Sequence, residues 1–123
     1  MADQHFKIYD LEERTHLFAK NCRDFAMELP KNTANYEYSP QLVRASGSVA
    51  ANYIEANESL SKKDFIHRAK ICRKEVKESR LWLRLVLCKD QAQEDRRTML
   101  MQEAFELTKI FSSIIEKSKS FDH

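Results

Sequence analysis

The scarcity of turn-forming residues is the strongest constraint that this sequence places on its fold. The 123 residues include one glycine and two prolines. Folds rich in β-strands need many tight turns, and glycine and proline are the residues that favour such turns. The sequence is also 33% charged and 42% hydrophobic, a balance that suits amphipathic helices. We therefore expect long helices with few connections, in a chain whose length suits one domain.

Apolar residues recur at helical spacing in four segments. The second segment is expected to begin with Ser39 as its N-cap and Pro40 at its first helical position. The connections are short, which makes successive helices antiparallel neighbours. The sequence thus predicts an all-α, up-down-up-down antiparallel four-helix bundle, with residues 1–123 as a single domain. The expected helices span about residues 11–29, 40–57, 62–88 and 93–118.

The single glycine, Gly47, lies inside the second predicted helix. A glycine in a helix interior costs about 0.5–1 kcal/mol relative to alanine. Gly47 belongs to a face of small and apolar residues that lies apart from the core face of the same helix. These residues either admit a neighbouring helix of the same bundle or contact a second subunit, and we favour the subunit contact. On the third helix, Ile71, Glu75, Glu78, Trp82 and Leu85 are expected opposite the core. The residues predicted at a homo-oligomer interface are Gly47, Ala50, Ala51, Ile71, Trp82 and Leu85.

A narrow line of polar residues, the polar seam, also runs along one side of the second helix. Its residues need partners from other helices, because the two charged ends of the seam lie too far apart to pair with each other. One interpretation is a buried structural network that fixes the orientation of the helices, and the other is a ligand pocket. The residues predicted for this network are Arg44, Ser48, Asn52, Glu55 and Glu75.

Positive charge gathers on the third helix. Residues 62–89 contain ten Lys and Arg against three acids, whereas the whole chain has a net charge of +2. A continuous basic stripe is typical of proteins that bind the phosphate backbone of RNA or DNA. The alternatives are a solvated face, or pairing with Glu94, Asp95, Glu103 and Glu106 of the fourth helix at a subunit boundary. The predicted nucleic-acid-binding residues are Lys70, Arg73, Lys74, Lys77, Arg80 and Arg84.

The sequence offers no constellation of catalytic or metal-binding residues. Two patterns resemble the Glu-x-x-His ligands of di-metal bundles, but helical geometry turns Glu13 and His16, and likewise Asp64 and His67, away from the core. One glycine excludes the glycine-rich phosphate loops. The three cysteines lack CxxC spacing and are expected to be reduced thiols, with Cys22 and Cys72 in the core. We expect no enzyme activity, no metal and no cofactor.

The hydropathy of the chain favours a cytoplasmic protein. Mean hydropathy is −0.63, and no apolar run approaches the roughly 18 residues that a membrane-spanning helix needs. The acidic start MADQHFKIYDLEE lacks the basic and apolar regions of a signal peptide.

Several stretches together resemble one known family. They are RTHLFAKNCRDFAMELPKN, QLVRASGSVAANYIEANESLSKKDFIHRAKICRKEVKESRLWLRL and the closing LTKIFSSIIEKSK. Over about residues 6–118 the chain resembles the four-helix bundle proteins of the 23S rRNA-intervening sequence family. The motifs that carry the resemblance are Arg14-Thr15, Leu29-Pro30-Lys31, Gln41-Leu42-x-Arg44 leading to Ser48, Asn52-x-x-Glu55-Ala56, Arg73-Lys74-Glu75 and Trp82-Leu83.

This resemblance implies an up-down bundle that assembles into a ring-like homopentamer. It also implies a relation to the accessory variability proteins of diversity-generating retroelements, which are pentamers of similar bundles that work with a reverse transcriptase and nucleic acid. The family name records gene location, and the biochemical role of the family is unsettled. We therefore expect a non-enzymatic homo-oligomer that binds RNA or DNA through its third helix. The alternative is an oligomeric scaffold for protein interactions that does not bind nucleic acid.

Overall fold

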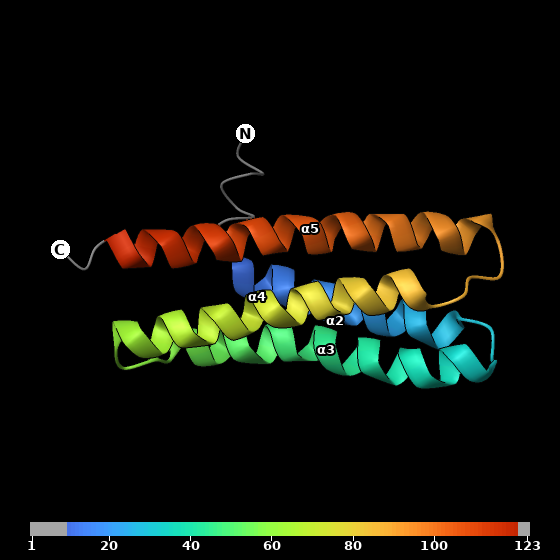
Figure 1. Cartoon of the computed structure of the whole chain (residues 1–123), viewed down its shortest axis with the longest axis horizontal. Helices are drawn as coiled ribbons and strands as arrows, with labels where there is room; N and C mark the ends of the chain where they lie inside the picture. Colours follow the sequence, from blue (N-terminus) through green and yellow to red (C-terminus); the bar gives the residue numbers. More distant parts are fainter. Residues whose placement is uncertain (1–9, 121–123) are drawn as a thin grey trace.

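The computed structural model describes residues 10–120, and within this range the chain is all-α (Figure 1). Its four helices run alternately up and down, which confirms the predicted all-α bundle of four helices. The expectation that the chain starts without a signal peptide falls largely on residues 1–9, outside the described range. The helices are α2 (Leu11–Glu28), α3 (Thr33–Asn57), α4 (Lys62–Leu85) and α5 (Gln91–Ser120).

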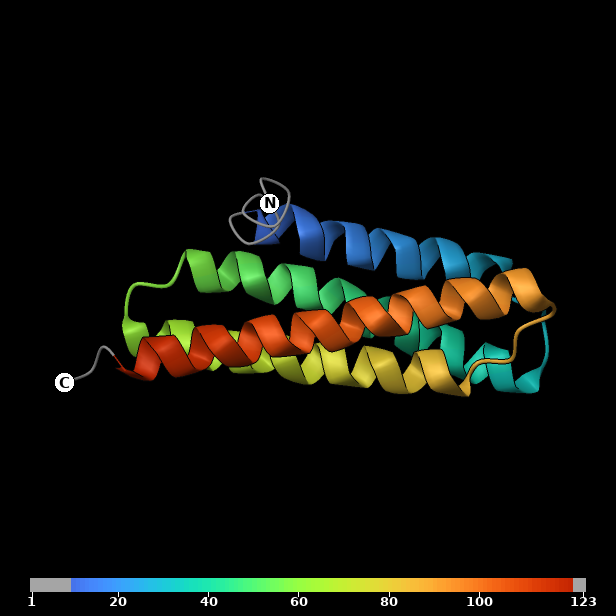
Figure 2. The same ribbon diagram turned by 90° about the horizontal axis from the view of Figure 1, so that it is seen from above.

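The helices follow one another around the bundle in chain order. α3 packs closely against both α2 and α4, and α4 packs closely against α5. α2 and α5 are the least closely packed neighbours, while α2 and α4 lie diagonally across the bundle (Figure 2). α5 also extends past the first residues of α2 (Figure 2).

Aromatic and aliphatic side chains from all four helices fill the core. Phe18, Phe25 and Phe111 are its largest fully buried members. Cys22 and Cys72 are buried among them as free thiols, as predicted. Burial raises the pKa of each of these two thiols to about 12. Both groups therefore stay protonated at neutral pH and behave as small apolar side chains.

α3 begins earlier than the sequence analysis predicted. The prediction of Ser39 as N-cap and Pro40 as the first helical residue is wrong. Asn32 caps the helix, because its side-chain oxygen accepts a hydrogen bond from the Asn35 backbone N–H at 2.8 Å. Pro40 lies inside the helix on its exposed face. At that face water can bind the carbonyl group that the proline leaves without its helical donor.

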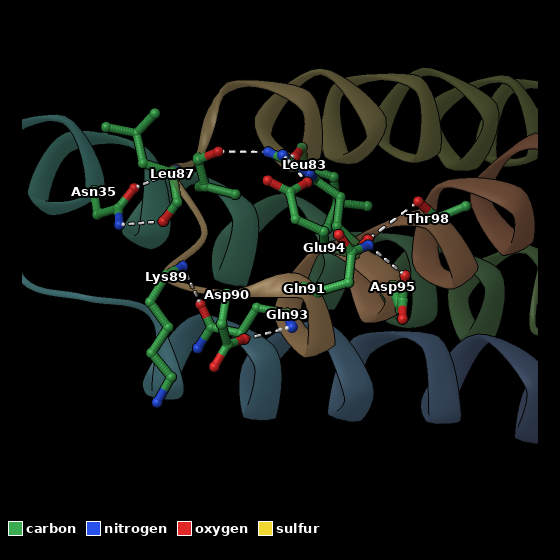
Figure 3. Close-up of polar contacts among 12 residues, drawn as sticks. Asn35, Leu83, Leu87, Lys89, Asp90, Gln91, Gln93, Glu94, Asp95 and Thr98 are labelled. Atoms are coloured by element: carbon green, nitrogen blue, oxygen red, sulfur yellow. Dashed lines mark hydrogen bonds and ion pairs between the residues drawn. The ribbon is translucent and has the colours of Figure 1, made fainter.

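At one end of the bundle, polar side chains form hydrogen bonds with the connections between helices (Figure 3). The Asn35 amide donates to the carbonyl oxygens of Pro30 and Leu87, and its oxygen accepts from the Leu87 N–H. Gln93 likewise links the Glu28 carbonyl to the Lys89 N–H. α4 ends at Leu85, three residues before the predicted end, and Arg97 donates to the carbonyl oxygens of Leu83 and Val86 there.

A membrane-spanning helix is not found within residues 10–120, because none of the helices there combines sufficient length with sufficient apolar character.

Candidate nucleic-acid interface and assembly surface

The outer face of α4 carries the predicted basic stripe. One flank of α4 faces α3, where Arg68 donates to Asn52, and the other faces α5, where Arg73 donates to the Ser112 hydroxyl at 3.2 Å. The face between these flanks is exposed. Five of the six predicted residues are exposed and make no hydrogen bond or ion pair with any described residue. They are Lys70, Lys74, Lys77, Arg80 and Arg84.

The structure adds one cation to this surface. Lys63, the second residue of α4, is exposed on the same face. Lys63, Lys70, Lys77 and Arg84 follow one another at intervals of seven residues. Because an α-helix rises 1.5 Å per residue, this basic row covers about 32 Å in a nearly straight line. The seven-residue spacing was visible in the sequence and could have revealed Lys63.

The acidic residues of α5 have partners other than this row. Arg14 of α2 donates to Glu103 through two nitrogens, at 2.7 and 2.8 Å, and to Glu106 at 2.9 Å. Glu94 pairs with Arg97 within α5. Asp95 accepts a hydrogen bond from Gln91. The positive charge of the α4 face is thus not neutralised by α5 of the same chain.

The surroundings of Gly47 bear on the first of the two explanations for this glycine, a close neighbour within the same bundle. A Cβ atom added at Gly47 would meet no described atom within 4 Å, so the residue does not admit a neighbour within the same bundle. It lies on the outer face of α3 with Ala51, Val43 (40% exposed) and Ile54 (49% exposed). Apolar side chains on the outer face of a helix mark a candidate interaction surface.

The predicted polar network forms only in part. Asn52 donates to Ser48 and accepts from Arg68, so that these three side chains link α3 to α4. Arg44 is exposed and donates to Gln41 on its own helix, and Glu55 is exposed. Long side chains at the outer edge of the seam reach water, and this explains why Arg44 and Glu55 stay outside the network.

Glu75 and Trp82 do not lie opposite the core, and that prediction is wrong. Glu75 is buried, and one of its carboxylate oxygens has no hydrogen-bond partner among the described residues. Trp82 packs against the core and stacks on Tyr38 of α3, with ring centroids 5.8 Å apart. The face of α4 that packs against the bundle is therefore wider than the predicted apolar stripe. Leu85 is 38% exposed, and Ile71 and Ala50 are partly buried.

The residues of the Glu-x-x-His patterns are exposed. Glu13, His16, Asp64 and His67 all face outward, as the helical geometry predicted. Within residues 10–120, no group of three or more His, Cys, Asp or Glu side chains could hold a metal ion.

Comparison with known proteins identifies the family. The family model described as 23S rRNA-intervening sequence protein matches residues 7–113. The chain belongs to this family. A solved structure of a protein with unknown function, from the S23 ribosomal protein family of Bacteroides thetaiotaomicron, is similar to the bundle with a TM-score of 0.71. The two chains are 26% identical, and the match covers 85% of this chain and 96% of the other. No curated protein matches the chain.

Proposed function

We propose that this intervening-sequence family protein binds RNA or DNA through the basic face of α4 and acts as a homo-oligomer. The observation that carries the proposal is that five cations of one exposed helix face have no partner within the described chain. Phosphate groups supply the negative charge that such a face lacks, and their binding releases condensed counterions from the nucleic acid.

The chemistry of the face favours contact with the backbone over reading of bases. Stacking on single-stranded bases needs exposed aromatic rings. The tryptophan of α4, Trp82, is instead stacked on Tyr38 of α3. The basic row is straight and made of flexible side chains, which suits phosphates of many sequences. The protein is therefore proposed to bind nucleic acid with little sequence preference.

The outer face of α3 supports the homo-oligomer. Gly47 lowers the surface of this helix at its centre, and nothing in the described chain uses the space. Val43, Ala51 and Ile54 continue the apolar surface on both sides. A helix of a second copy could approach closely there, and assembly would repeat the α4 face and multiply the number of phosphate contacts.

Substitution of the basic row tests the proposal. The variant replaces three residues of the basic row and their exposed neighbour Lys74, and it carries Lys70→Gln, Lys74→Gln, Lys77→Gln and Arg84→Gln. The matched control carries Lys31→Gln in the connection between α2 and α3, and Lys109→Gln, Lys117→Gln and Lys119→Gln on α5. Both variants lose four positive charges. Binding of fluorescent structured RNA and duplex DNA is measured by anisotropy at low salt. We expect at least a tenfold loss of affinity in the row variant and a much smaller loss in the control.

Equal affinity of the two variants would assign any binding to net charge and would contradict an α4 interface. Absence of binding by the wild-type protein at low salt would overturn nucleic-acid binding altogether. The oligomeric protein-interaction scaffold would then be the better account of the fold.

A further inference from the structure

A groove between α2 and α5 hollows the surface of the bundle. It has a volume of about 500 Å³, and it lies along the least closely packed neighbouring helices. Its apolar wall includes Leu17, which is 44% exposed, and Met99, which is 72% exposed. Asp10, Glu13, Glu103 and Glu106 surround this apolar surface. Exposed apolar side chains framed by carboxylates are typical of a docking surface.

The groove carries an excess of negative charge. Arg14 is the one Lys or Arg in its lining, against four carboxylates. Arg14 already binds Glu103 and Glu106, its side chain is only 14% exposed, and the hydrogen bond to Glu103 is the main reason that its pKa is raised. This guanidinium therefore stays charged, but it does not balance the carboxylates. An occupant of the groove must bring apolar surface together with positive charge.

The surface around Gly47 has both properties. Two hollows of about 370 and 440 Å³ lie between α2 and α3, and they meet at Val43. Their linings contain no carboxylate. Their cations are Lys20, Arg23 and Arg44, with His16 at one end. Lys20 and Arg23 share the single partner Asp24, and Arg44 is bound only to the neutral Gln41. The surface around Gly47 therefore has a net positive charge next to apolar side chains.

We propose that the α2/α5 groove of one copy receives the Gly47 surface of a second copy. This inference rests on the proposed homo-oligomer and names the surface that the outer face of α3 meets. The exposed Leu17 and Met99 side chains would enter the open space over Gly47 and beside Val43. The carboxylates around the groove would then face Lys20, Arg23 and Arg44 of the other copy.

This contact joins two different surfaces, so each copy would use one surface toward each neighbour. Both surfaces include α2 and lie on adjoining sides of the bundle. A heterologous contact of this kind turns every copy relative to the last and can close into a ring. α4 lies diagonally across the bundle from α2 (Figure 2). Its basic row would therefore remain accessible to nucleic acid in the assembly.

Reversal of charge on each surface tests the pairing. The groove variant carries Glu13→Lys and Glu106→Lys, and Arg14 keeps Glu103 as its partner. The face variant carries Lys20→Glu and Arg44→Glu. Each is compared with a control that carries Glu58→Lys and Glu116→Lys, two exposed positions outside both surfaces. Analytical ultracentrifugation gives the mass of each protein, and circular dichroism checks its helix content.

We expect the control to assemble like the wild-type protein, and each surface variant to sediment as a monomer with unchanged helix content. A one-to-one mixture of the groove and face variants should assemble again. The intact face of the groove variant fits the intact groove of the face variant, and the two reversed surfaces carry opposite charges. An oligomeric groove variant of wild-type mass would overturn the pairing and leave the homo-oligomer standing. A monomeric wild-type protein would overturn both the pairing and the homo-oligomer. The proposed nucleic-acid binding is tested by its own binding measurement.

Discussion

At the scale of single residues, Gly47 connects sequence, structure and proposed assembly. Its position in a helix interior is intrinsically unfavourable, and the structure shows empty space where its side chain would be. A bundle that needed only its own stability would gain from a larger residue here. The glycine therefore makes physical sense when a second copy uses the space.

Replacement of Gly47 by Leu should separate folding from assembly. The Cβ atom of a leucine would meet no described atom within 4 Å, and leucine has a higher helix propensity than glycine, so the free energy of unfolding of the monomer should rise by about 0.5–1 kcal/mol. The same side chain should block the approach of a second copy. Chemical denaturation at low concentration measures the first effect, and sedimentation measures the second. A wild-type mass for the Leu variant would refute the assembly role of this position.

The cysteines should differ sharply in reactivity. Cys22 and Cys72 are buried, whereas Cys88 is partly exposed. With a thiol reagent at pH 8, one thiol per native chain should react rapidly, and none in a Cys88→Ser variant. Rapid reaction of all three thiols would contradict the buried core.

The raised thiol pKa values also affect stability at high pH. Burial raises the pKa of Cys22 and Cys72 from 9.0 to about 12, so at pH above 9 the unfolded chain loses these protons before the folded chain does. The contribution of the two thiols to stability is complete below pH 9 and is lost as the pH rises toward 12. Replacement of both by Ala should flatten this decline in denaturant titrations.

At the scale of helices and their connections, local patterns in the sequence predicted the helices, but not the contacts between residues that lie far apart in the sequence. Periodicity located all four helices. The predicted start of α3 is too late because it places Pro40 at the first helical position, whereas a proline is tolerated inside a helix on its exposed face. The partners of Asn35 and Gln93 are backbone groups 52 and 65 residues away, and no local pattern reveals them. The groove was missed for the same reason, since Arg14 meets Glu103 across 89 residues.

Asn35 should be essential for the end of the bundle shown in Figure 3. Its side chain bonds three backbone groups in two connections. Asn35→Ala leaves these groups without their partner, and we expect a loss of about 2–4 kcal/mol in the free energy of unfolding. Asn21→Ala, at an exposed position of α2, should change it by less than about 0.5 kcal/mol. Similar values for the two variants in urea denaturation would count against this role.

At the scale of the whole molecule, charge is divided between different sides of the bundle. The outer face of α4 is basic, while the groove between α2 and α5 is acidic. The sequence revealed the basic side because its residues lie on one helix, and it missed the acidic side because that side combines two distant helices. This division suits a protein that presents α4 to a polyanion and uses other surfaces for assembly.

The salt dependence of nucleic-acid binding tests the central claim most directly. Affinity of the wild-type protein for duplex DNA is measured over a salt series, beside the Lys70→Gln, Lys74→Gln, Lys77→Gln, Arg84→Gln variant. A phosphate-binding row predicts that log K falls linearly with log[salt], at about 0.9 per phosphate neutralised, and that the variant has a slope smaller by about one per lost contact. An unchanged slope in the variant, or no binding by the wild type at low salt, would contradict the account.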